Sequence, residues 1–80
     1  MKANVFITLK KDVLDPQGKA IAQSLKNLGF DGINDVRQGK LIEIEISKKN
    51  NSDVYIEIEN MCKKLLANTV IENYKIEITE

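Results

Sequence analysis

The sequence contains no histidine, only one cysteine and no long apolar run. Without histidine the chain cannot build a Ser-His-Asp triad, a Cys-His nucleophile pair or a histidine-ligated metal site. The single cysteine, Cys62, cannot form a disulfide within the chain, which favours a reducing, intracellular setting. A membrane-spanning helix needs about 20 apolar residues, and residues 1–11 alternate in polarity where a signal peptide would be apolar. We therefore expect a cytoplasmic protein that does not enter a membrane.

Length and charge exclude further classes of protein. The chain has 80 residues, with 12 basic and 12 acidic side chains. This length predicts one domain over residues 1–80, and a fold of this size buries only about 60% of the surface of its unfolded chain, which leaves little room for a deep cleft. The balanced charge gives no general attraction to nucleic acid or anionic lipid. The chain also lacks the row of aromatics that an RNA-binding sheet displays, so we expect no nucleic-acid partner.

Alternating polarity predicts four strands. Near the start of the chain the apolar side chains of residues 3–9 fall mainly on one parity, which is typical of a strand with one buried face. Phe6 interrupts the polar face of this strand, which suggests a partner there. Gly39, between Gln38 and Lys40, predicts a hairpin turn, because glycine supplies the positive φ that tight turns need. The predicted strands are residues 3–10, 33–38, 40–47 and 70–79.

A first helix is predicted over residues 16–28. Asp15 can accept hydrogen bonds from the first free amides, and Pro16 suits the first helical position because it has no amide to leave unpaired. Ile21 and the leucines that follow it recur at helical spacing, so one stripe faces a core. Gly29 is the expected residue after the helix, where a positive φ is common.

A second helix is predicted from an N-cap at Asn51 or Ser52 to a stop at Asn68. Its start follows the polar loop of residues 48–51, and asparagine at the stop tolerates the left-handed conformation. The apolar stripe of this helix consists of Val54, Ile58, Met61 and Leu65, widened by Cys62 and Leu66.

The element order is therefore βαββαβ. Such an order predicts an α+β fold, a two-layer sandwich in which two helices cover one face of a four-stranded antiparallel sheet. The other sheet face carries both signs of charge, so it is either solvated or a self-complementary polar interface. Its expected residues are Thr8, Lys10, Glu43, Glu45, Lys75 and Glu77.

No group of side chains predicts catalysis, a cofactor or a metal. Glu43 and Glu45 are expected on a solvated strand face, which does not favour acid–base chemistry. Cys62 lies within an apolar stripe, where a free cysteine behaves as a small hydrophobe. Arg37 is the only arginine, and its planar fork suits either a contact with a partner or a pair with Asp35 or another acid of the chain.

Three segments resemble one family when they are taken together. They are VLDPQGKA at 13–20, DVRQGK at 35–40 with Ile42 and Glu43 after it, and the stretch from Met61 to Tyr74. These are similar to the PurS family, the small subunit of phosphoribosylformylglycinamidine synthase in purine biosynthesis. The resemblance covers nearly the whole chain in order and at matching lengths. One departure is Thr69, where the family usually has proline, and it leaves this turn less rigid.

The resemblance implies a role inside a larger enzyme. The family's complex makes formylglycinamidine ribonucleotide (FGAM) from formylglycinamide ribonucleotide (FGAR), ATP and glutamine. A glutaminase subunit, PurQ, releases ammonia, and a large synthetase subunit, PurL, binds ATP and magnesium. PurS is the non-catalytic partner, usually a dimer, that bridges the two and assists ammonia transfer. This chain is thus expected to hold no cofactor itself.

The resemblance also selects candidates for subunit contact. Arg37 and Lys40 are expected to meet acidic or phosphate-bearing groups of the larger subunits, whereas capping and turn geometry remains an equally good interpretation of residues 15–18 and Asn68. The full set is Asp15, Pro16, Gln17, Gly18, Arg37, Gly39, Lys40, Asn68, Glu72 and Tyr74. The alternative function is a stand-alone βαββαβ module that senses a small metabolite at a dimer interface. A small hydrolase would need an arginine at an anion-binding loop near the first strand, and the sequence has no arginine in that region.

Overall fold

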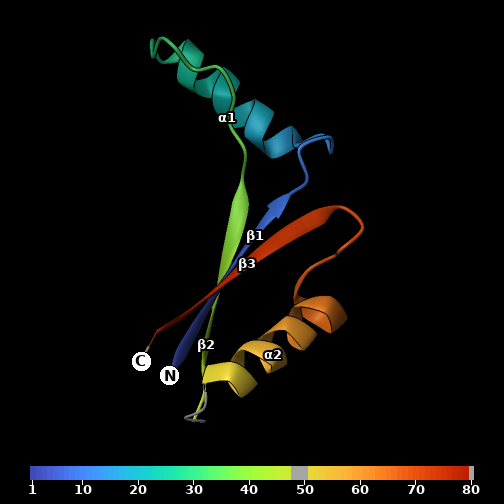
Figure 1. The fold of residues 1–80 in the computed structure, drawn as a ribbon. Coiled ribbons are helices and arrows are strands. Elements are labelled where there is room, and N and C mark those ends of the chain that lie inside the picture. The colour runs from blue at the N-terminus through green and yellow to red at the C-terminus, as the bar shows by residue number, and fades with distance from the viewer. Residues whose placement is uncertain (48–50, 80) are drawn as a thin grey trace.

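The fold is built on an antiparallel sheet of three strands (Figure 1). The structure is a computed structural model that describes residues 1–47 and 51–79. Strand β1 (Lys2–Leu9) lies in the centre, between β2 (Gly39–Glu45) and β3 (Glu72–Thr79). The α+β class is confirmed, and the prediction of a four-stranded sheet is wrong.

The missing strand is the one expected at residues 33–38. This segment has no strand structure, and Gly39 is the first residue of β2 and not a turn with positive φ. The backbone N–H of Gln38 donates to Oδ2 of Asp15 over 2.7 Å, which holds the chain where the hairpin would have turned. Figure 1 shows the chain before β2 running back alongside α1 (Pro16–Asn27), so no hairpin forms.

The first helix begins and ends as its local sequence predicts. Oδ1 of Asp15 accepts a hydrogen bond from the N–H of Gly18 over 2.9 Å, and proline occupies the first helical position. At the other end Gly29 has a φ of +95° and its N–H donates to the Lys26 carbonyl, as in a Schellman motif. Local capping therefore determines both ends of α1.

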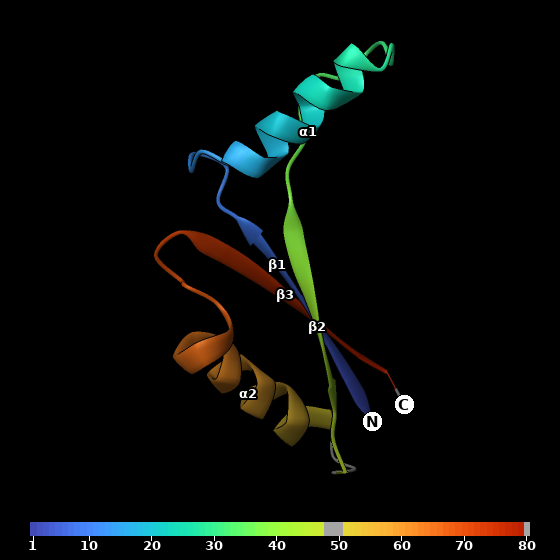
Figure 2. The same ribbon diagram turned by 180° about the vertical axis from the view of Figure 1, so that it is seen from behind.

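The two helices do not share one sheet face, contrary to the prediction. Helix α2 (Asn51–Met61), continued by the π-helical turn η1 (Cys62–Leu66), lies over the sheet, whereas α1 projects beyond the sheet end (Figures 1 and 2). Helix α1 makes no extensive contact with any strand or with α2. The molecule is consequently elongated, with extents of 48 × 26 × 15 Å.

The hydrophobic core lies between the sheet and α2. The parity of the strands is as predicted, since Val5 is buried and faces Ile42 of β2 and Ile76 of β3. On the helix side the expected stripe is partly wrong, because the side chains of Met61 and Leu65 are 39% and 83% exposed. The fully buried row along this helix is instead spaced by four residues, at Val54, Ile58 and Cys62. The buried core residues are Ala3, Val5, Ile7, Val54, Ile58, Cys62 and Ala67.

The predictions at the start of α2 fall on residues that are only partly described. Residues 48–50 of the expected loop, and the side chains of the two N-cap candidates Asn51 and Ser52, lie outside the described part of the chain. Asn51 is the first residue of α2, close to the predicted start.

Candidate subunit-contact site at the junction of the helix and the sheet

A pocket of about 230 Å³ lies where α1 joins the sheet. It is bounded by the end of β1, the start of α1, and the first residues of β2 and β3. The topology thus brings together residues that are up to 65 positions apart in the sequence, from 7 to 72. Of the residues predicted to contact other subunits, those that line this pocket are Asp15, Gln17, Gly39, Lys40 and Glu72.

Asp15 is the structural centre of the junction. Its two carboxylate oxygens accept hydrogen bonds from different segments, Oδ1 from Gly18 in α1 and Oδ2 from Gln38 just before β2. Its side chain is 5% exposed. The hydrogen bond from Gln38, followed by that from Gly18, holds the pKa of Asp15 below its usual range. The carboxylate therefore caps the helix and also ties it to β2, which supports the structural interpretation of residues 15–18.

Gly18 allows the two segments to approach each other closely. A Cβ at this position would overlap the carbonyl oxygen of Val36 and would lie 2.8 Å from Oδ2 of Asp15. Pro16, at the first position of α1, fixes the direction in which the helix leaves the junction. Gly39 is similarly confined, because a Cβ there would lie 2.6 Å from the carbonyl oxygen of Ile7.

Arg37 binds the connection between β1 and α1. One terminal nitrogen, Nη2, donates to the carbonyl oxygens of Lys10 and Val13, both over 2.9 Å. Among the described residues Arg37 forms no ion pair with Asp35 or with another acid, which was one of the two expectations. The guanidinium is exposed and uses one nitrogen in these contacts. A hollow of about 280 Å³, lined by Lys11, Asp35 and Arg37, lies beside it.

Lys40, Glu72 and Asn68 form a polar chain across the same end of the sheet. Nζ of Lys40 lies 3.8 Å from a carboxylate oxygen of Glu72, and the lysine side chain is 57% exposed. The other oxygen of Glu72 accepts the N–H of Asn68 over 2.7 Å, and Oδ1 of Asn68 accepts the N–H of Val70 over 3.2 Å. Asn68 therefore lies just after the helical segment, which ends at Leu66 with Ala67 as its C-cap, and it lacks the left-handed conformation expected for a stop.

Tyr74 is the candidate that the structure places apart from the others. It faces Ile7 across the sheet and packs against the core. Its position on the buried face supports a packing role for the ring.

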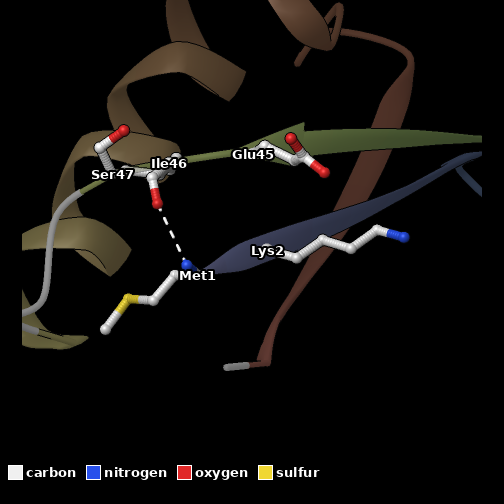
Figure 3. Close-up of a pocket in the computed structure, with 5 residues that line it drawn as sticks. All are labelled: Met1, Lys2, Glu45, Ile46 and Ser47. Atoms are coloured by element: carbon white, nitrogen blue, oxygen red, sulfur yellow. Dashed lines mark hydrogen bonds between the residues drawn. The ribbon is translucent and has the colours of Figure 1, made fainter.

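A second hollow, which sequence reasoning missed, lies at the opposite end of the sheet (Figure 3). It has a volume of about 450 Å³ and is lined by both chain segments that pair there. The amino group of Met1 donates to the carbonyl of Ile46 over 3.1 Å, and the Ile46 N–H donates back to the Met1 carbonyl. Nearby, Glu43 hydrogen-bonds the Lys2 ammonium at 2.7 Å and raises the pKa of Lys2. No sequence motif indicates this hollow, because it depends on how β1 and β2 pair.

The described residues offer little for catalysis. They contain no cluster of three or more cysteine, aspartate or glutamate side chains able to hold a metal ion. Burial, with a smaller effect from Glu59, raises the pKa of the Cys62 thiol and keeps it in its unreactive form. Within this part of the chain no helix is both long and apolar enough to span a membrane. The junction itself is built from hydrogen bonds and exposed charge.

Comparison with known proteins decides the family. The family model described as "PurS: Phosphoribosylformylglycinamidine (FGAM) synthase" matches residues 2–80. The chain belongs to the PurS family. The PurS subunit of phosphoribosylformylglycinamidine synthase from Bacillus subtilis is 44% identical over 79 residues, which cover 99% of this chain and 93% of that relative.

Solved PurS structures share the fold. The crystal structure of Methanocaldococcus jannaschii PurS, described as one of the subunits of formylglycinamide ribonucleotide amidotransferase in the purine biosynthetic pathway, matches with a TM-score of 0.88 and 47% identity over 99% of this chain and 95% of that one. A chain in the structure of PurLQS from Thermotoga maritima matches with a TM-score of 0.86 and 28% identity, over 95% of this chain and 93% of that chain. The resemblance inferred from the three sequence segments is confirmed.

Proposed function

We infer that this chain is the small, non-catalytic subunit of the FGAM synthase complex of purine biosynthesis. The observation that carries the conclusion is the family match over residues 2–80, supported by relatives near 45% identity over almost the whole chain. The likeness to a chain of PurLQS supports membership of a complex with counterparts of PurL and PurQ. Its place is the cytoplasm, with the pathway it serves.

The work of the complex is divided so that this chain performs no chemistry. The whole complex is an ATP-dependent ligase that uses glutamine as amido donor, with ATP and magnesium on the large subunit. This chain bridges the synthetase and the glutaminase and assists the passage of ammonia between them. The low reactivity of its buried Cys62 supports a role in assembly and not in covalent catalysis.

The junction is the surface we assign to the larger subunits. Arg37 and Lys40 are exposed there, and Lys40 has only a 3.8 Å surface ion pair, of the kind that contributes at most about 1 kcal/mol. A partner carboxylate or phosphate can therefore compete for Lys40 at little cost, and Arg37 offers the guanidinium nitrogens that its bonds to Lys10 and Val13 do not use. The hydrogen bonds of Asp15 tie the segment between Arg37 and Lys40 to the start of α1.

Copurification tests the assignment. The tagged chain, mixed with candidate synthetase and glutaminase subunits in the presence of glutamine and ADP, should retain both. The same mixture with substrate and ATP should show glutamine-dependent FGAM formation that requires this chain. Failure to retain either subunit, with no effect on activity, would contradict the proposed function.

Self-association is the second part of the proposal, as a homodimer or a higher homo-oligomer. Phe6 and Leu41 face each other on the outer side of the sheet and are 38% and 50% exposed, so they form an apolar contact without cover. The core of the chain is also small, and small cores are commonly completed by oligomerisation. Light scattering at micromolar concentration should give a mass of at least twice 9.1 kDa. A monomer mass would contradict this part.

A further inference from the structure

Strand β3 has one edge that pairs with no other strand in the described part of the chain. In the sheet order β2-β1-β3 it lies at the end of the sheet and pairs only with β1. It is eight residues long and contains neither glycine nor proline. A long, regular edge of this kind is a template for a further strand, and natural proteins rarely leave one open without a means of blocking it. The side chains of β3 therefore indicate which strand fits the edge.

The hydrogen bonds of the sheet show which backbone groups of β3 point towards the open edge. The N–H of Lys10 donates to the carbonyl oxygen of Ile71 over 2.9 Å. This pair continues the register in which Leu9 faces Glu72. In an antiparallel ladder every second residue of a strand bonds to a given neighbour, so the odd-numbered residues of β3 bond to β1. The residues of β3 whose N–H groups face the open edge are Tyr74, Ile76 and Ile78.

The sequence of β3 is complementary to its own reverse around Ile76. Lys75 and Glu77 flank this residue on the outer face of the sheet, and their side chains are 74% and 47% exposed. Tyr74 and Ile78 lie one position further out on the other face, where both pack against the core. An antiparallel copy centred on Ile76 therefore places lysine opposite glutamate twice on one face, and places apolar side chains opposite one another on the other.

We propose that two copies of the chain pair antiparallel through β3, about a two-fold axis at Ile76, and so join their two three-stranded sheets into one. The inference rests on the self-association proposed above and names an interface for it. At the axis the two Ile76 residues exchange both backbone hydrogen bonds, because their amides face the open edge. Lys75 of each copy then faces Glu77 of the other at a non-hydrogen-bonded position, where opposite side chains lie closest. Each copy presents the same patch, as an isologous interface requires.

Other registers place like charges together. The outward amides of the two copies meet only when the axis passes through a residue of β3, so the register changes in steps of one axis position. An axis at Lys75 sets two lysines opposite each other, and an axis at Glu77 sets two glutamates opposite each other, which is destabilising. Larger shifts shorten the paired length. Strand β2 offers no such match, because the charged residues of its outer face, Glu43 and Glu45, are both acidic.

The ion pair within the chain does not compete strongly with this arrangement. Nζ of Lys75 lies 3.7 Å from a carboxylate oxygen of Glu77 in the same strand. An exposed pair of this kind contributes little to stability. Both side chains can therefore turn to the partner copy, where each meets its opposite charge across a paired strand.

Charge reversal tests the register. Lys75→Glu places glutamate opposite Glu77 at both symmetry-related positions, so association through β3 should weaken by about tenfold or more. Glu77→Lys should have a similar effect, because it places two lysines together. The double variant Lys75→Glu/Glu77→Lys restores opposite charges in the same register and should associate like the wild type. Lys75→Ala removes the attraction without adding repulsion, and should weaken association less than Lys75→Glu does. Sedimentation equilibrium measures the dissociation constant of each variant.

Hydrogen exchange locates the interface residue by residue. At high protein concentration the outward amides of Tyr74, Ile76 and Ile78 should be protected in the wild type and in the double variant. Dilution, or either single charge reversal, should expose them. The amides of Lys75 and Glu77 bond to β1 and should stay protected in every variant, which confirms that the sheet itself is folded.

The outcomes separate the β3 interface from the self-association on which it rests. Free exchange of the three outward amides, in a wild type that light scattering shows to be associated, overturns pairing through β3 while self-association stands. A double variant that associates as weakly as the single reversals overturns the register. A wild type that is monomeric at every concentration overturns both the interface and self-association, and leaves the subunit role to the copurification experiment.

Discussion

Asp15 joins two parts of the molecule through one carboxylate. Because its two oxygens accept from Gly18 and Gln38, the side chain couples the start of α1 to the start of β2. Its N-cap role follows from local sequence, since aspartate before proline is a common helix start. Its bond to Gln38 spans 23 residues and depends on the tertiary path of the chain. The sequence therefore predicts half of what this residue does.

Asp15→Asn separates the two roles. The asparagine carbonyl oxygen can still cap α1, but the amide nitrogen replaces one acceptor and meets the N–H of Gln38 as a second donor. We expect a melting temperature several degrees lower with α1 still helical. Circular dichroism with thermal melting measures this, and Asp12→Asn, on an exposed residue nearby, should melt like the wild type. Equal melting of both variants would show that the bond to Gln38 contributes little.

The same carboxylate gives stability a defined pH dependence. The pKa of Asp15 is lowered by hydrogen bonds from Gln38 and Gly18, so the unfolded chain, with an aspartate pKa of about 3.9, binds the proton more readily. Its contribution is therefore full above about pH 5 and is lost as the pH falls through the lowered pKa. The difference in melting temperature between wild type and Asp15→Asn should be constant near neutral pH and shrink in acid. A difference that persists unchanged at about pH 2 would contradict this cause.

Gly18→Ala should be harmful although alanine is the better helix former. Alanine gains about 1 kcal/mol of helix propensity over glycine, but its Cβ would overlap the carbonyl oxygen of Val36. Displacing a backbone costs about 1–3 kcal/mol, so the free energy of unfolding should fall, or at best stay the same. Ser24→Ala, at an exposed position of α1, is the control and should be neutral or slightly stabilising. Chemical denaturation of both variants decides the point.

At the scale of elements, local patterns predicted what depends on neighbours in sequence. The ends of α1, and the buried parity of β1, β2 and β3, follow from capping and alternation. The strand at 33–38 was wrong because alternation shows that a segment can pair, but not where its partner lies. The position of α1 was wrong for the same reason, since an apolar stripe indicates burial but not the surface that provides it.

Helix α2 shows how a stripe can be assigned to the wrong residues. Spacings of three and four are both helical, so Met61 and Leu65 were indistinguishable from Ile58 in the sequence. In the structure Ile58 is fully buried and Leu65 is 83% exposed. Ile58→Ala should therefore lower the free energy of unfolding by about 2–5 kcal/mol, and Leu65→Ala should change it by less than about 0.5 kcal/mol. Urea denaturation of the two variants measures these changes. Similar losses of unfolding free energy in both variants would support the stripe expected from the sequence.

At the scale of the whole molecule, the chain has two parts with a well-defined junction. The sheet and α2 form a small core, and α1 extends away from it. Five of the ten residues predicted for subunit contact line the pocket where these two parts meet, which no single segment of the sequence could show. The family resemblance identified these residues as candidates, and the topology explains why they lie close together.

Removal of Lys40 should separate assembly from chemistry. Lys40→Ala leaves the sheet intact, because this side chain makes only a 3.8 Å surface pair with Glu72. We expect glutamine-dependent FGAM formation by the reconstituted complex to fall several-fold, since the bridge to the larger subunits weakens. Activity with ammonium salt in place of glutamine should change little, because no ammonia has to pass between subunits. Lys75→Ala, on the outer face of β3, is the control for loss of one exposed lysine. Equal losses with glutamine and with ammonium salt would indicate damage to the synthetase reaction itself, and unchanged activity with both would place the contact surface elsewhere on the chain.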